Sequence, residues 1–184
     1  AGLEDGATWQ YSTDGGTTWA LGTGASFNLK GGTYAANTIQ VKQTDVAGND
    51  STAVVLNKAA ITIIDVTPPS APTVALAADT GVKDDDHITK NGQVNVELED
   101  GATWQYSTDG GTTWALGTGA SFNLNGGTYN ANTIQVKQTD VAGNDSSAAV
   151  LNEADAITID VTAPSAPTVA LAADTGVKDD DHIT

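Results

Sequence analysis

Apolar and polar side chains alternate in short runs through residues 67–161, and turn-forming residues separate the runs. The clearest run, 93–99, places Val94, Val96 and Leu98 on one face and polar side chains on the other. Alternation with a period of two is typical of half-buried β-strands, and no stretch shows a helical period. We expect strands at 73–77, 93–99, 103–107, 112–116, 120–124 and 133–139, and a last strand from 146–152 and 156–161 that is broken around 153–155.

The number and spacing of these runs predict the fold class. Several short strands with turn signals between them are typical of a β-sandwich. We therefore expect an all-β protein built from tandem immunoglobulin-like β-sandwiches with Greek-key connections, at 95 residues per repeat. A repeat of this length is an ordinary domain size, although its core would be aliphatic, with little aromatic area.

The chain repeats itself after 95 residues. Residues 3–89 align with 98–184 without a gap, and only ten of the 87 aligned pairs differ. The Pro-rich segments 65–72 and 160–167 are natural linkers, because proline favours an extended, semi-rigid backbone. They predict three parts: 1–66, an Ig-like domain lacking its first strand; 67–161, a complete Ig-like domain; and 162–184, the first strand and A–B loop of a third repeat.

The two ends of the chain carry parts of the repeat that complement each other. Residues 162–184 have the sequence that would precede the first domain, short of a few residues of one strand. One expectation is head-to-tail complementation, in which this tail completes residues 1–66 of another molecule by strand addition. The other is that both ends fray. The molecular mass in solution separates the two.

The segment Ser-Thr-Asp-Gly-Gly-Thr-Thr-Trp at 12–19 recurs at 107–114 and resembles the Asp-box of sialidases. It indicates either a sugar-cleaving enzyme or a hairpin turn. Sialidases hold the substrate carboxylate with an arginine cluster, whereas all seven basic residues of this chain are lysine, which cannot form the same bidentate contact. Asp-Gly-Gly also suits the positive φ angles of a tight hairpin. We expect a structural turn and no enzyme.

The formal net charge of −16 limits the classes of partner that this chain can bind. Phosphate backbones would be repelled, which argues against nucleic acid, whereas divalent cations would be attracted. The chain has no cysteine, which excludes disulfides and zinc–thiolate sites. It also has no apolar run long enough to span a membrane.

Acidic and amide side chains concentrate in loops that an immunoglobulin-like topology brings to the two ends of the domain. The loop 79–87 and Asp160 would share the C-terminal end, while 99–100 and 140–145 would face Asp65 of the preceding domain across the linker. Calcium needs several such oxygen ligands at short range. The candidate ligands are Asp65, Asp79, Asp84, Asp85, Asp86, Glu99, Asp100, Asp140, Asn144 and Asp160, with the repeat counterparts Glu4, Asp5, Asp45, Asn49, Asp174, Asp179 and Asp181.

Each of these residues also has a simpler structural interpretation. Asp140, in Asp-Val-Ala-Gly-Asn, is typical of an Asx-turn. Asp65 and Asp160 suit exposed strand ends, and an Asp triplet suits a solvated loop. His87 is expected to be a solvated loop residue, because imidazole is a poor calcium ligand.

Four segments, 79–92, 101–114, 138–144 and 159–164, resemble in sequence and order the bacterial Ig-like repeats of giant biofilm-associated and RTX-type adhesins. The resemblance covers essentially the whole chain. It implies a secreted protein of the bacterial cell surface, exported by a type I system. It also implies calcium at the domain junctions, neighbouring repeats of the same chain as partners, and an extender that holds a distal adhesive tip away from the cell. The glycine-rich nonapeptides of RTX segments are absent.

A second function remains open from the sequence. An Ig-like module could bind carbohydrate or a host surface through the aromatic residues Trp104, Tyr106 and Trp114. Exposure of these rings on one sheet face would favour such binding, whereas burial would remove its basis.

Overall fold

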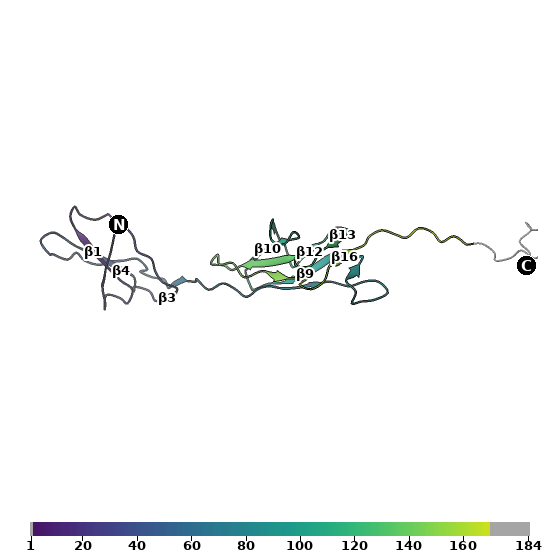
Figure 1. The fold of residues 1–184 in the computed structure, drawn as a ribbon. Helices are drawn as coiled ribbons and strands as arrows, with labels where there is room; N and C mark the ends of the chain where they lie inside the picture. Colours follow the sequence, from purple (N-terminus) through teal and green to yellow (C-terminus); the bar gives the residue numbers. More distant parts are fainter. Residues whose placement is uncertain (1, 170–184) are drawn as a thin grey trace, which may run out of the picture.

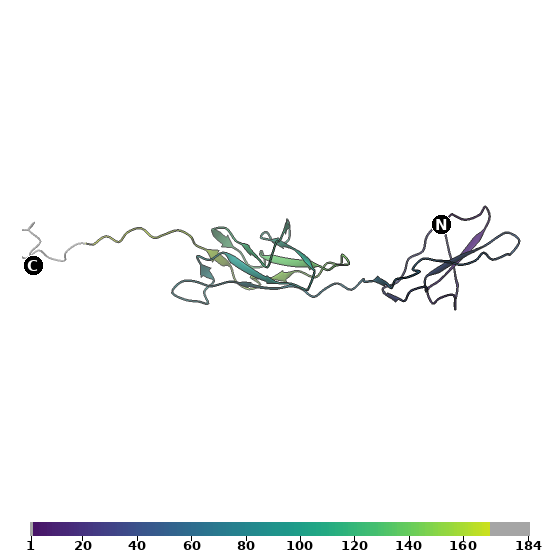
Figure 2. The ribbon, with the colours of Figure 1, turned by 180° about the vertical axis from the view of Figure 1, so that it is seen from behind.

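The computed structural model describes residues 2–169, and every regular element in that part of the chain is a β-strand. Figure 1 shows two β-units in a row joined by an extended segment, and the view from behind in Figure 2 shows the same order. The first unit contains β1 (Thr8–Ser12), β2 (Ala20–Leu21), β3 (Gly32–Tyr34), β4 (Gln40–Thr44), β5 (Val54–Val55) and β6 (Thr62–Ile64). The second unit contains β7 (Thr73–Leu76), β8 (Ile88–Thr89), β9 (Gln93–Glu97), β10 (Thr103–Ser107), β11 (Ala115–Leu116), β12 (Ser121–Asn123), β13 (Gly127–Tyr129), β14 (Gln135–Thr139), β15 (Ala149–Val150) and β16 (Ile157–Ile159).

The second unit is a β-sandwich, as the alternating sequence predicts. One sheet has the strand order β11-β10-β14-β15, a second has β12-β9-β7, and a third, small sheet has β13-β16-β8. All pairs are antiparallel except β16 with β8, which is parallel. Alternate residues of the strands point inward, so Val94, Val96, Phe122, Val136 and their neighbours form one buried cluster.

Trp104 is the largest side chain of this core and is 3 % exposed. Its indole Nε1 donates a hydrogen bond to the carbonyl oxygen of Gly119 at 3.0 Å, which satisfies the polar group of the buried ring. The backbone of Gly117 lies against the ring, where a Cβ atom would come within 2.1 Å of it. The glycine between β11 and β12 is therefore required for close packing.

Three details of the strand assignment differ from the prediction. Residues 146–152 and 156–161 do not form one broken strand, because β15 pairs with β14 whereas β16 pairs with β13 and β8 in another sheet. The two short strands β8 and β13 were not predicted. The expected strand 112–116 is reduced to β11, because the backbone of Thr113 donates a hydrogen bond to the turn residue Asp109.

The first unit repeats the pairing of the second with fewer strands. The sheet β2-β1-β4-β5 corresponds to β11-β10-β14-β15, and β3-β6 corresponds to β13-β16. Residues 2–66 contain no counterparts of β7, β8 and β9, and residues 26–28, which align with β12, form no strand. Trp9 and Ile39 are buried, but Val54, Leu56, Ile61 and Ile63 are largely exposed.

Candidate metal sites at the ends of the repeat

The Asp-box forms a closed hydrogen-bonded turn in both units. In the second unit, the carboxylate of Asp109 accepts hydrogen bonds from the Thr113 hydroxyl at 2.6 Å, the Thr113 backbone N–H at 2.9 Å and the Ser107 hydroxyl at 2.7 Å. These bonds, led by the Thr113 hydroxyl, lower the pKa of Asp109 to about 2. Asp14 makes the same contacts, and its pKa is also lowered to about 2. Both carboxylates are engaged in shaping the turn.

The three candidate aromatic residues do not form an exposed platform. Trp104 is in the core, and Tyr106 stacks on Phe122 with ring centroids 4.3 Å apart. Trp114 is partly covered: its Nε1 donates to the carbonyl oxygen of Gly111, and Lys137 Nζ lies 5.1 Å from its ring centroid. Of the three, Trp114 alone belongs to the turn surface, which weakens the basis for ligand binding by these rings.

The N-terminal end of the second unit holds the linker through amide side chains. Gln138 is buried; its Oε1 accepts a hydrogen bond from the Glu99 N–H at 2.8 Å, and its Nε2 donates one to the Ser70 carbonyl oxygen at 2.8 Å. Asn144 Nδ2 donates to the carbonyl oxygen of Asp65 at 3.3 Å. The predicted meeting of Asp65 with the 140–145 loop is therefore present, as a hydrogen bond from the Asn144 side chain to the Asp65 backbone and not through the Asp65 carboxylate.

Asp140 closes a local turn, although its partner is Asn144, four residues on, and not the residue two positions on as in an Asx-turn. Its Oδ1 accepts a hydrogen bond from the Asn144 N–H at 2.8 Å, and its Oδ2 accepts one from Asn144 Nδ2 at 2.9 Å. These bonds, with the Asn144 side chain first, lower the pKa of Asp140. Asp45 and Asn49 repeat the turn in the first unit. Both oxygens of each aspartate thus already have local partners.

The C-terminal end of the second unit contains a carboxylate oxygen with no partner. Asp79 Oδ2 accepts a hydrogen bond from the His87 N–H at 2.9 Å, while Asp79 Oδ1 is buried and has none. His87 has a positive φ of 60°, which folds the loop back over Asp79. A buried, unpaired carboxylate oxygen is costly unless a cation or water satisfies it.

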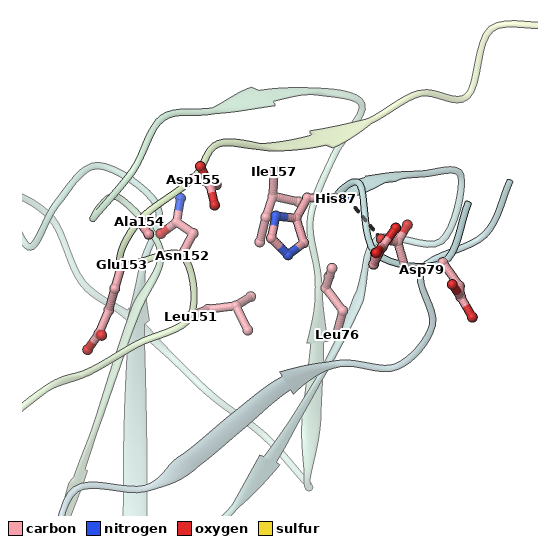
Figure 3. Close-up of a pocket in the computed structure, with 11 residues that line it drawn as sticks. Leu76, Asp79, His87, Leu151, Asn152, Glu153, Ala154, Asp155 and Ile157 are labelled. Atoms are coloured by element: carbon pink, nitrogen blue, oxygen red, sulfur yellow. Dashed lines mark hydrogen bonds between the residues drawn. The ribbon is translucent and has the colours of Figure 1, made fainter. Parts of the chain in front are cut away.

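Two hollows flank this loop. Asp79, Asp84 and Asp85 line one of about 590 Å³, and Asp86 and Asp160 line another of about 550 Å³. The predicted proximity of the 79–87 loop to Asp160 is therefore present in the second hollow. In the first hollow, Figure 3 shows Asp79 on one side of His87 and Ile157, with Glu153 and Asp155 on the other. The acidic residues thus lie on opposite sides of the hollow and do not converge on one point.

The remaining candidates are scattered. Glu4, Asp45 and Asn49 line a small hollow of about 190 Å³ in the first unit. Asp5 and Asp100 are exposed turn residues. Asp174, Asp179 and Asp181 lie outside the described residues. Within residues 2–169, no group of three or more His, Asp or Glu side chains lies close enough to hold one metal ion.

Sequence reasoning did not identify Gln138 as the residue that holds the linker. A signal was present, because Gln138 follows Ile134 and Val136 on the inward face of its strand. A polar residue at an inward position requires hydrogen-bond partners, and here they come from the linker and from the loop before β10.

Comparison with known proteins gives no family assignment. The chain matches no protein-family model and no curated protein. In the part of the chain that the structure describes, no helix is long and apolar enough to cross a membrane.

Proposed function

We propose that this chain is a structural extender: a series of immunoglobulin-like repeats in a secreted bacterial cell-surface adhesin, which projects a distal adhesive tip for attachment and biofilm formation. The observation that carries the proposal is the junction between the two units. Two β-units, nearly identical in sequence where they align, follow each other in line, and the linker between them is hydrogen-bonded to the second unit through Gln138 and Asn144. A spacer requires length and stiffness, which repeated units with short, fixed linkers supply.

Calcium is the proposed stiffening ion. The unpaired Asp79 Oδ1 supports a cation at the C-terminal end of the repeat, where Asp86 and Asp160 lie in the neighbouring hollow. Asp79 would supply one ligand of the ion, and backbone carbonyl oxygens and water, which calcium commonly takes, would supply the others. The bound ion would supply positive charge among carboxylates that otherwise repel one another.

The charge distribution explains why an ion would matter here. Residues 67–161 contain 13 acidic residues and three lysines. Asp50 and Asp145 already have lysine partners, Lys42 at 2.6 Å and Lys137 at 3.2 Å, and Asp14 and Asp109 bind within their own turns. The 84–86 triplet has no such ion pair among the described residues. The three carboxylates of this triplet repel one another, and bound calcium would relieve that repulsion.

Thermal unfolding in chelator and in calcium tests the proposal. At a calcium concentration ten times the Kd, which for extracellular modules is on the order of 10⁻⁴–10⁻³ M, we expect the melting temperature of the second unit to rise by about 5–10 °C. Asp79→Asn should remove at least half of that rise, because it replaces the charged carboxylate, whose Oδ1 has no partner, with a neutral amide.

Glu153→Gln is the matched control. It removes the same charge from the other side of the same hollow, at a position where the first unit has Lys58. The control should keep the calcium-dependent rise. Equal melting temperatures in chelator and calcium for the wild-type chain would contradict the proposal.

A further inference from the structure

The second unit contains both Asn-Gly pairs of the chain, Asn91-Gly92 and Asn125-Gly126. Asn125 and Gly126 are exposed in the loop between β12 and β13, whereas Asn91 and Gly92 are half-buried in the loop before β9. The first unit has Lys30 where the second has Asn125. The chain thus carries the same dipeptide in two environments, together with a repeat in which the exposed asparagine is replaced.

An asparagine followed by glycine holds an electrophile and a nucleophile on neighbouring residues. The electrophile is the side-chain amide carbon Cγ, and the nucleophile is the backbone nitrogen of the next residue. Glycine lacks a Cβ, which lets its backbone approach groups that any other residue would keep away. Whether the two atoms meet depends on how freely the loop moves and on whether either group is already hydrogen-bonded.

In the loop 124–127 neither reacting group is engaged. Within residues 2–169, neither the Asn125 side chain nor the Gly126 N–H makes a hydrogen bond. The Tyr129 hydroxyl donates to the Asn125 carbonyl oxygen at 3.2 Å. Because a trans peptide directs its N–H away from its C=O, the Gly126 N–H points away from Tyr129. The nucleophilic nitrogen therefore faces away from the ring that holds the loop.

Asn91-Gly92, in contrast, is held on both sides. Asn91 Oδ1 accepts a hydrogen bond from the Gln93 N–H at 3.0 Å, and the Asn91 N–H donates one to the Thr89 hydroxyl at 3.0 Å. The Gly92 carbonyl oxygen accepts from the Leu124 N–H at 2.8 Å, and a Cβ on Gly92 would come within 2.3 Å of the Leu124 carbonyl oxygen. Reaction at Asn91 therefore requires these contacts to open first.

We propose that Asn125 is a site of spontaneous modification, at which the chain converts its own asparagine to aspartate and isoaspartate. The Gly126 nitrogen gives its proton to a base in the solvent and attacks Asn125 Cγ, which closes a five-membered imide. The bond from Cγ to the side-chain nitrogen breaks, and that nitrogen takes a proton from the solvent and leaves as ammonia. Water then adds to one of the two imide carbonyl carbons and opens the ring. The net reaction consumes one water and releases one ammonia.

The modified loop lies where the chain leaves the second unit. Gly127 pairs with Ile159 of β16, and a Cβ on Gly126 would come within 3.1 Å of a methyl group of Val161. Figure 1 shows β13 and β16 at this end of the unit. Either product adds a negative charge here, and isoaspartate also adds one atom to the backbone before β13. We therefore expect isoaspartate to displace Gly127 and to loosen the pairing of β13 with β16.

Incubation of the whole chain in heavy-oxygen water at mildly alkaline pH, followed by peptide mapping with mass spectrometry, tests this proposal. We expect Asn125 to convert at least about tenfold faster than Asn91 in the same molecules, because Asn91 reacts only from a locally opened state. In urea, which exposes both pairs, the two rates should approach each other. Backbone fragmentation should identify isoaspartate as well as aspartate at position 125, each with a heavy oxygen taken from water.

Asn125→Lys is the matched control, because it places the residue of the first unit at this position. It should abolish the reaction at position 125 and leave the rate at Asn91 unchanged. After the same incubation, the melting temperature of the wild type should fall, whereas that of Asn125→Lys should not. Conversion of Asn91 as fast as that of Asn125 in the folded chain, a ratio of the two rates that urea leaves unchanged, or aspartate without isoaspartate at position 125 would overturn the proposal.

Discussion

At the residue scale, the Ser-x-Asp turn shows how a short motif determines its own geometry. The Ser107 hydroxyl accepts hydrogen bonds from the backbone N–H groups of Asp109 and Gly111 and donates one to the Asp109 carboxylate. Gly110 and Gly111 have positive φ angles of 74° and 86°, as the sequence predicts for this turn. The motif therefore predicts its local fold well. It does not predict which tryptophan is buried, because that depends on the opposite sheet.

The low pKa of Asp109 predicts a pH dependence of stability. A carboxyl group with a pKa of about 2 in the folded state and 3.8 as its ordinary value stabilises the fold above pH 4, and this contribution is lost as the pH falls from about 4 towards 2. Asp109→Asn should therefore lower the melting temperature at pH 7, and the difference from the wild type should shrink as the pH falls to 2. A difference that stays constant over this range would refute the assignment.

At the element scale, the sequence predicts long, amphipathic strands more reliably than short ones. β9, β10 and β14 begin or end within two residues of their expected bounds, because each has at least two inward-facing positions. β8 and β13 have two and three residues, too few for a visible alternation. The separation of β15 from β16 follows from pairing with different sheets, which is a tertiary effect and cannot be read from local periodicity.

Identical strands in the two units allow a direct test of how coverage affects stability. β4 and β14 have the same sequence, Gln-Val-Lys-Gln-Thr, but β7 and β9 complete the sandwich around β14 alone. We expect the amides of β4 to exchange with deuterium at least about tenfold faster than those of β14, because local opening costs less in an uncovered unit.

The difference between Ala35 and Asn130 separates the corresponding peptides by mass, so both strands can be followed in one dilute, monomeric sample. Equal protection of β4 and β14 would show that the covering strands contribute nothing to local stability.

At the scale of the whole molecule, the repeat and the proline positions predict the serial arrangement, and topology predicts which loops meet. Asp86 and Asp160 share a hollow, and Asn144 reaches Asp65, as expected. The sequence could not show that Asp140 would use both oxygens in its own turn or that Asp79 would keep one oxygen unpaired. Those outcomes depend on loop backbone geometry at the scale of single hydrogen bonds.

The central claim is that calcium binds the repeat at its C-terminal end, through Asp79. A calcium titration followed by calorimetry, on the wild-type chain and on Asp79→Asn, measures this most directly. We predict a dissociation constant on the order of 10⁻⁴–10⁻³ M for the wild type and binding weakened at least about tenfold in Asp79→Asn. A wild-type chain that binds no calcium, or equal dissociation constants for the two proteins, would contradict the account.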